Sequence, residues 1–414
     1  MRKKTSLTRN GTFTLFLLTL SAFNSQVFAD FAYVTNNNDT VSVIDTSSST
    51  VIATIPVGQN PVGVAITPNG QFAYVVNNSD QDVSVINTNT NTIVATIPVG
   101  QGPIGVAIIP NGQFAYVVNN ATFFESVSVI DTSTNTIVAT IPVGTAPFQD
   151  AANPNGLFVY VVNSVDGTVS VINTSTNTVV ATASVGGNPY GIAVTPNGLF
   201  AYVTNYGINL VNVLDTNTNM VVATISVGIN PQGVAITPNG QFAYVTNFNN
   251  TSVSVIDTSS NMVIATVPVG SFPGGVAITP DGQFAYVADS KITIINTSTN
   301  TVVGSITVGL LPQEIAFREG TSLLPPNNLS GHQKKNDFGL LFERFNLLQW
   351  EASPSASQVA GYFVYRNGVK IATLSASTFE YEDHNRKKGV TTSYSVTAFN
   401  SSNSESAATT IQIN

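Results

Sequence analysis

Short apolar runs alternate with polar turns along most of this chain. The runs are four to seven residues long, are rich in Val, Ile, Thr, Phe and Tyr, and are bounded by Gly, Pro, Asn or Asp. Runs of this kind predict β-strands rather than helices. One motif, FAYV or a close variant, marks a repeat of 41 to 44 residues that starts at Phe31, Phe72, Phe114, Phe158, Phe200, Phe242 and Phe284.

Each repeat contains four such runs in the same order, of the types FAYVTN, TVSVID, TVVATIPVG and GVAIT. Turns of the type Pro68-Asn69-Gly70 separate GVAIT from the next FAYV run and predict a tight hairpin. Four antiparallel strands in about 42 residues are typical of one blade of a β-propeller. We therefore predict an all-β fold with a seven-bladed β-propeller.

Proline predicts the order of the strands within a blade. Pro56, Pro98, Pro142 and Pro268 lie inside the TVVATIPVG run, and proline belongs on a sheet edge because it cannot donate to the ladder. From the axis outward we therefore name the strands A (GVAIT), B (FAYVTN), C (VSVID) and D (ATIPVG). The first blade lacks an A strand and residues 312–317 form an A strand with no blade of its own, so the two ends are expected to pair and close the ring.

The runs at Phe31–Asn36, Tyr202–Asn205 and Tyr244–Asn247 resemble the YVTN-repeat β-propeller family, which is found in many secreted and surface-layer-like microbial proteins. The resemblance covers most of residues 30–317. Copies with VVN at Val76, Val118 and Val162, or with Ala288-Asp289, keep the strand pattern. The resemblance implies architecture and location better than activity, since propellers host many functions.

The repeat stops after Phe317. Residues 318–328 are predicted to be a linker and residues 329–414 a small β-sandwich. This last segment resembles a fibronectin type III domain in Trp350, in the hairpin Tyr365-Arg366-Asn367-Gly368 and in Tyr394, which takes the place of that family's corner tyrosine.

The first 29 residues have the pattern of a secretory signal peptide. Four basic residues precede an apolar run at 13–23, and Val27-Phe28-Ala29 forms a small-residue cleavage site before Asp30. We therefore predict an exported protein that is periplasmic, at the cell surface or extracellular. No later run approaches the ~20 apolar residues of a membrane span, so no transmembrane segment is expected.

The charge of the repeat region disfavours anionic partners. Residues 30–317 contain fourteen Asp and Glu but only one basic residue, Lys291. Phosphate binding depends on several Lys or Arg contacts, so nucleic acid and anionic membranes are not expected to bind the propeller.

The repeat region also lacks the side chains of common catalytic sites. The chain has no Cys, its two histidines, His332 and His384, lie in the C-terminal segment, and the blades contain no Arg. Asp45, Asp131, Asp215 and Asp257 recur at one turn, where we expect them to cap the turn. Asp39, Asp80, Asp82 and Asp166 lack a calcium-type ligand loop. These features predict a protein that is not an enzyme and has no metal or cofactor.

The candidate ligand-binding residues lie on one face. Loops B–C and D–A emerge on the same side of a propeller and vary between copies, and they carry irregularly placed aromatic residues. Asp150 is an acid in an A strand, either bathed in channel water or binding a cation or polar ligand, and a buried charge there must be solvated, paired or protonated. The candidates are Phe123, Phe124, Phe148, Asp150, Tyr190, Tyr206, Phe248 and Phe272.

The leading hypothesis is therefore an exported interaction protein that binds a protein or glycan partner through this face. A structural coat or envelope component at the cell surface is the alternative. A propeller enzyme of the lactonase, lyase or dehydrogenase type is a third hypothesis, and it requires a cluster of ionisable groups at the channel mouth.

Overall fold

The computed structural model describes residues 30–121, 124–318, 325–337, 342–353, 359–399, 405–406 and 408–414. The predicted signal peptide, residues 1–29, lies outside these described residues. The chain divides into two compact units, one spanning Phe28–Ser322 and one containing Leu323–Asn414. The described residues are almost entirely β-strands, with a single 3-10 turn, η1, at Phe248–Asn250.

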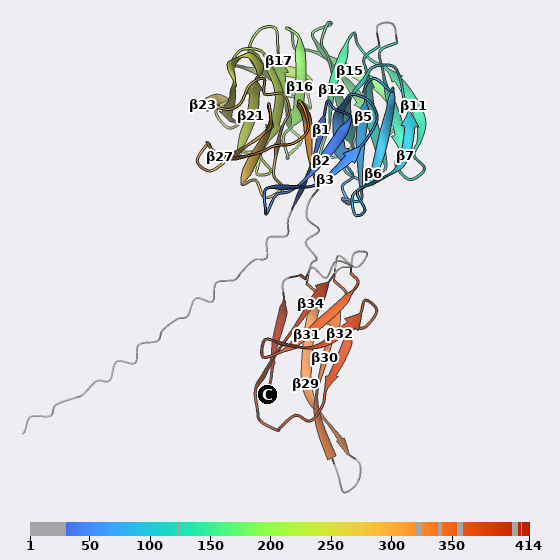
Figure 1. The fold of residues 1–414 in the computed structure, drawn as a ribbon, viewed down its shortest axis with the longest axis vertical. Coiled ribbons are helices and arrows are strands. Elements are labelled where there is room, and N and C mark those ends of the chain that lie inside the picture. Colours follow the sequence, from blue (N-terminus) through green and yellow to red (C-terminus); the bar gives the residue numbers. More distant parts are fainter. Residues whose placement is uncertain are drawn as a thin grey trace, which may run out of the picture. The chain divides into compact units, whose positions relative to one another are not determined.

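The first unit is a β-propeller built from repeated four-stranded antiparallel sheets (Figure 1). Three of the sheets, in hydrogen-bonded order, are β28 (Pro312–Arg318), β1 (Phe31–Asn36), β2 (Thr40–Asp45), β3 (Thr50–Pro56); β4 (Pro61–Ile66), β5 (Phe72–Asn77), β6 (Asp82–Asn87), β7 (Thr92–Pro98); and β8 (Pro103–Ile108), β9 (Phe114–Asn119), β10 (Ser126–Asp131), β11 (Thr136–Pro142).

The sheets that follow along the chain have the same order. They are β12 (Pro147–Ala152), β13 (Phe158–Asn163), β14 (Thr168–Asn173), β15 (Thr178–Ser184); β16 (Pro189–Val194), β17 (Phe200–Asn205), β18 (Leu210–Asp215), β19 (Met220–Ser226); β20 (Pro231–Ile236), β21 (Phe242–Asn247), β22 (Ser252–Asp257), β23 (Met262–Pro268); and β24 (Val276–Ile278), β25 (Phe284–Ala288), β26 (Ile292–Asn296), β27 (Thr301–Ile306).

The predicted strand order A-B-C-D is confirmed in these sheets. The four D strands that contain proline, β3, β7, β11 and β23, each lie at the edge of their sheet, as the missing N–H of proline requires. The A strands contact one another in the order β28, β4, β8, β12, β16, β20, β24 and back to β28. The A strands therefore form the inner ring.

The predicted pairing between the two ends of the repeat region is also confirmed. Strand β28 pairs antiparallel with β1, with Ala32 opposite Phe317 and Val34 opposite Ile315. The Arg318 guanidinium extends the contact to the next sheet, where it donates to the Gly70 and Thr88 carbonyl oxygens at 3.1 and 3.4 Å. The last strand of the repeat region therefore completes the first sheet.

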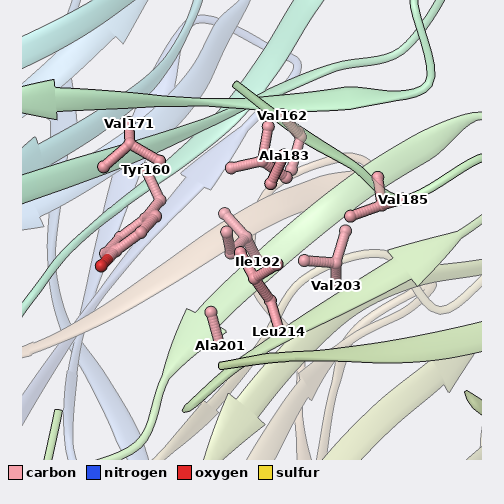
Figure 2. Close-up of a cluster of buried hydrophobic side chains, with 10 residues drawn as sticks. Tyr160, Val162, Val171, Ala183, Val185, Ile192, Ala201, Val203 and Leu214 are labelled. Carbon is pink, nitrogen blue, oxygen red and sulfur yellow. The ribbon is translucent and has the colours of Figure 1, made fainter. Parts of the chain in front are cut away.

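The core lies between neighbouring sheets, where apolar faces pack against each other. Figure 2 shows one such cluster, with Tyr160 and Val162 of β13 on one side and Ala201 and Val203 of β17 on the other. Tyrosine in the FAYV motif also links the sheets by hydrogen bonds. The Tyr202 hydroxyl, for example, donates to Asn261 Oδ1 in the C–D turn of the next sheet at 2.7 Å.

The threonine of the YVTN motif ties the inner ring together. The Thr204 hydroxyl accepts from Gly191 N–H of its own sheet at 2.8 Å and donates to the Gln232 carbonyl of the next sheet at 2.6 Å. Thr246 makes the same pair of bonds to Gly233 and Gly274. The motif therefore contributes directly to the geometry of the A strands.

The recurrent aspartates cap their turns, as predicted. Each accepts hydrogen bonds from the backbone N–H groups two and three residues further on, and these are Asp45, Asp131, Asp215 and Asp257. At Asp131 the hydrogen bonds from the Ser133 side chain and backbone lower the pKa of the carboxyl. These acids therefore form hydrogen bonds within their own turns.

The second unit contains two antiparallel sheets. Their strands are β29 (Asn327–Asp337), β30 (Phe342–Glu351), β33 (Glu380–Asp383) in one, and β32 (Val369–Ser375), β31 (Gly361–Arg366), β34 (Thr392–Phe399), β35 (Thr409–Ile413) in the other. Trp350 is buried and contacts Tyr362 edge-on at 5.7 Å between ring centroids. None of the helical structure in the described part of the chain is long and apolar enough to cross a membrane.

Candidate functional site

The inner ring of A strands encloses a cavity of about 230 Å³. Each of the seven A strands lines the cavity with residues at its second, third or fourth position, counted from the proline that begins the A run. For β24 that proline is Pro273, so Gly274 and Gly275 precede the strand itself. The polar and aromatic residues of the lining are Phe148, Gln149, Asp150, Tyr190, Gln232, Gln313 and Glu314. We call this the axial cavity.

Two positions of the A run, counted from its proline, set β12 and β28 apart from the other A strands. The third residue is glycine in five runs, and the exceptions are Gln149 in β12 and Glu314 in β28. Gln149 Nε2 lies 3.2 Å from Glu314 Oε2, so the two exceptional side chains meet although 165 residues separate them. The fourth residue is Val or Ile in every A strand except β12, where it is Asp150.

At Gly191 and Gly233 glycine is required because neighbouring A strands approach closely there. A Cβ at Gly191 would lie 2.3 Å from the Gln232 carbonyl oxygen, and one at Gly233 would lie 2.6 Å from the Gly274 carbonyl oxygen. At Gly105 the nearest atom to such a Cβ is Asp150 Oδ1, at 2.8 Å. The space left by Gly105 is therefore occupied by the Asp150 carboxyl.

Asp150 is buried, with only 8% of its surface exposed. Neither of its carboxyl oxygens has a hydrogen-bond partner of standard geometry. Burial raises the pKa of Asp150 well above its usual value, and the backbone N–H groups of Ala107 and of Asp150 itself oppose this shift only in part. Asp150 therefore keeps its proton to a higher pH than an exposed aspartate does, and protonation is one of the three states expected from its sequence position.

Glu314 is the second acid of the axial cavity. Burial raises the pKa of its carboxyl to about 7, against the opposing effects of the Ile315 backbone N–H and the Gln149 side chain. Burial, Glu314 and Tyr206 together raise the pKa of the Tyr190 hydroxyl. Near neutral pH, Glu314 therefore exists in both its charged and its neutral form.

The predicted aromatic residues form two groups in the structure. Phe148 contacts Tyr190 at 3.9 Å between ring centroids, and Tyr190 stacks on Tyr206 at 5.9 Å. Phe248 contacts Phe272 at 5.2 Å. The first group includes two residues that line the axial cavity, so it connects the variable loops with the channel.

The longest B–C loop carries the two remaining predicted phenylalanines. Phe124 is 81% exposed, and Phe123 lies outside the described residues. The B–C and D–A loops meet as expected, because Asn78 N–H in a B–C loop donates to the Asn60 carbonyl of a D–A loop at 3.0 Å.

The acids of the B–C loops bond to backbone groups of the D–A loops. Asp80 accepts from Gln59 N–H at 2.8 Å, Asp39 from Asn60 N–H at 2.9 Å and Asp166 from Thr145 N–H at 2.7 Å. Within the described residues, no group of three or more His, Cys, Asp or Glu side chains is placed to hold a metal ion.

Gln149 and Glu314 were not predicted from the sequence as site residues. The sequence does distinguish them, because they occupy the third position of the only two A runs that lack glycine there. Their contact could not be predicted from the sequence, because it depends on the ring that places β12 and β28 around the same cavity.

The raised pKa of Glu314 predicts a pH-dependent stability. Its pKa rises from 4.5 to about 7 on folding, so between these values the folded chain holds a proton that the unfolded chain has released. The free energy of unfolding is therefore expected to fall with rising pH across this window, by at most roughly 3 kcal/mol from this group, and to level off above it.

Urea unfolding at a series of pH values will test this expectation. In Glu314→Gln the decrease should become smaller, leaving the part that Asp150 contributes. The propeller's other glutamate provides the control, since Glu125→Gln should follow the unsubstituted chain. Identical pH profiles for Glu314→Gln and the unsubstituted chain would contradict the assignment.

Comparison with known proteins identifies propeller relatives at a distance. Residues 111–232 match the family described as the cytochrome D1 heme domain. Among solved structures, hydrazine synthase of Kuenenia stuttgartiensis matches with 24% identity and a TM-score of 0.60, covering 64% of this chain and 92% of that one. A functionally unknown protein from Desulfotomaculum acetoxidans DSM 771 matches with 20% identity and a TM-score of 0.62, covering 70% and 99%. No curated protein matches. The structural matches establish the propeller fold.

A haem group, which the name of the matched family implies, does not fit the axial cavity. The volume of about 230 Å³ is below the roughly 300–1,000 Å³ of typical ligand pockets. Haem iron is held by His, Cys, Met or Tyr, and Tyr190 is the only residue of these types in the lining. Because the pKa of Tyr190 is raised, its hydroxyl stays protonated and is a poor iron ligand.

The comparisons also correct the prediction that this protein is not an enzyme. Residues 111–232 match a family described as a heme domain, and hydrazine synthase is among the solved structures that share the fold. The prediction judged each residue in isolation. Asp150 and Glu314, two acids from separate sheets, both line the axial cavity.

Proposed function

We propose that this chain is an exported protein with a seven-bladed propeller at residues 30–317, a linker at 318–328 and a fibronectin type III-like domain at 329–414. The pairing of β28 with β1 and the circular order of the A strands support the ring. The arrangement of three strands on four, the buried Trp350 and the hydrogen bond from the Tyr394 hydroxyl to Asp383 at 2.5 Å support the second domain.

We further propose that the axial cavity binds a small polar molecule and that Glu314 exchanges a proton with it. The observation that carries this proposal is the meeting of Gln149 and Glu314, the two side chains that replace glycine in the inner ring. A ring built only to be stable has no need of two polar side chains there, since glycine at this position suits the close approach of the strands.

The chemistry of the site is suited to acid–base work. A carboxyl with a pKa of about 7 donates and accepts protons near neutral pH, which is the property of an efficient general acid or base. Gln149 donates to Glu314 Oε2 and thereby orients the carboxyl. Asp150 is a second carboxyl of the lining whose pKa is raised by burial.

Screening of small polar molecules for stabilisation of the full chain will test this proposal. We expect at least one compound to raise the unfolding temperature in a saturable way. Its effect should be lost in Glu314→Gln and in Gln149→Gly, and it should persist in the control Glu125→Gln. A compound that stabilises all three variants equally binds elsewhere and would count against the axial cavity.

A second candidate function is binding of a protein or glycan partner by the loops of the same face. It is favoured by the strong exposure of Phe124 and Phe272, at 81% and 62%. Exposed aromatic side chains on a rigid scaffold are common at binding surfaces. The aromatic group of Phe148, Tyr190 and Tyr206 would connect such a surface with the axial cavity.

A further inference from the structure

We propose that the ligand of the axial cavity is a small organic cation, a primary or methylated ammonium. This inference rests on the proposed function above and specifies its ligand class. It follows from the charges, the unpartnered groups and the aromatic rings of the lining.

The lining offers acceptors for a cation and no positive group for an anion. It contains two carboxyls, Asp150 and Glu314, and the carboxamide oxygens of Gln149, Gln232 and Gln313, but no Lys, Arg or His. Lys291, the only basic residue of 30–317, bonds to Ser305 Oγ in β27 at 2.9 Å, away from the A strands. A bound anion would therefore have no countercharge.

Asp150 is a buried acid of the cavity lining, and its carboxyl lies against Gly105 of the neighbouring A strand. It is more than nine-tenths buried, lines the cavity, and has two carboxyl oxygens without a partner of standard geometry. Buried polar groups without partners are costly and rare, and such a group requires an explanation. An ammonium N–H donor would satisfy these oxygens and compensate their charge.

Aromatic rings favour an organic cation over a hydrated metal ion. Phe148 and Tyr190 both line the cavity, with ring centroids 3.9 Å apart. Aromatic faces attract ammonium groups by cation–π interaction, whereas Ca²⁺ requires six to eight oxygen ligands. The volume of about 230 Å³ limits the ligand to a few heavy atoms.

Binding of a cation should release protons. Asp150 and Glu314 have raised pKa values, so a cation that favours their charged forms displaces their protons. The other titratable group at the cavity is Tyr190. Two further titratable residues, Tyr33 and Tyr286, belong to strands β1 and β25, which pack against β28. The Tyr33 hydroxyl donates to Asn91 in an outer turn. Affinity for the cation should therefore rise between pH 6 and pH 8.

Calorimetric titration of the full chain with methylammonium and tetramethylammonium chloride will test the inference, with methanol, tert-butanol, sodium acetate and calcium chloride as comparison probes. We expect saturable binding of at least one ammonium. The affinity should rise by up to about tenfold per pH unit and fall at least about tenfold in Asp150→Asn. Asp150→Val, which restores the residue type of the other A strands, should have the same effect, and Glu125→Gln should have none.

The remaining outcomes separate the two proposals. The chain could instead bind a neutral alcohol, acetate or calcium preferentially and lose that binding in Glu314→Gln. This result would overturn the inference of an organic cation, but the proposal that the axial cavity binds a small polar ligand would stand. Ammonium binding that is unchanged in both Asp150 variants would also overturn it. If no probe binds and the screen of polar molecules also finds none, both proposals fail.

Discussion

A chain that ends at Leu311 is expected to lose cooperative folding, whereas a chain that ends at Arg318 should keep a stable propeller. The seven residues between these ends are strand β28. Without β28 the inner edge of β1 is unpaired, and the core around Ala32 and Tyr286 loses Ile315 and Phe317. The two apolar side chains and the lost ladder amount to about 5 kcal/mol or more, which is comparable with the whole stability of many domains.

Urea unfolding followed by circular dichroism will measure the difference between the two shortened chains. A third variant, Ile315→Asp in the full chain, tests the same contact without removing residues, because Ile315 is 4% exposed and opposite Val34. We expect it to destabilise the propeller by several kcal/mol. Equal unfolding midpoints for the chains that end at Leu311 and Arg318 would show that the pairing of β28 with β1 does not stabilise the fold.

Repetition explains why the sequence predicted so much of the propeller. One blade alone would leave the order of its strands open. The comparison of copies identifies the edge strand from Pro56, Pro98 and Pro142, and the mismatch between the first and last copies identifies the pairing of β1 with β28. The first inference depends on a local property of proline, and the second depends on counting the strands in each copy. Neither inference requires knowledge of the side-chain packing.

The candidate site was predicted less completely because it depends on distant contacts. Asp150 was predicted because it interrupts an apolar A strand. Gln149 and Glu314 were not, because they belong to two strands, β12 and β28, that meet only across the ring. Phe148, Tyr190 and Tyr206 were predicted one by one, and only the structure places them in a stack. The wrong prediction of a non-enzyme has the same origin, because Asp150 and Glu314 line one cavity only after folding.

The same substitution, glycine to alanine, is expected to have opposite effects at two positions of the propeller. In Gly191→Ala the new Cβ would lie 2.3 Å from the Gln232 carbonyl oxygen and 3.1 Å from Thr204 Oγ1. Backbone must move to relieve this contact, which also disturbs the bonds of Thr204 to Gly191 and Gln232. Overpacking of this kind should lower the free energy of unfolding by about 3 kcal/mol.

Gly304→Ala provides the matched control. Gly304 lies in the outer strand β27, where the nearest atom to an added Cβ is Ile294 Cδ1 at 3.9 Å, and the other D strands have alanine at this place. Since alanine restricts the unfolded chain, this change should stabilise the protein by about 0.5–1 kcal/mol. Urea unfolding of both variants decides the matter. Similar losses of unfolding free energy at the two positions would mean that the inner ring is packed no more tightly than the outer edge. The close approach of the A strands would then not explain the glycines around the axial cavity.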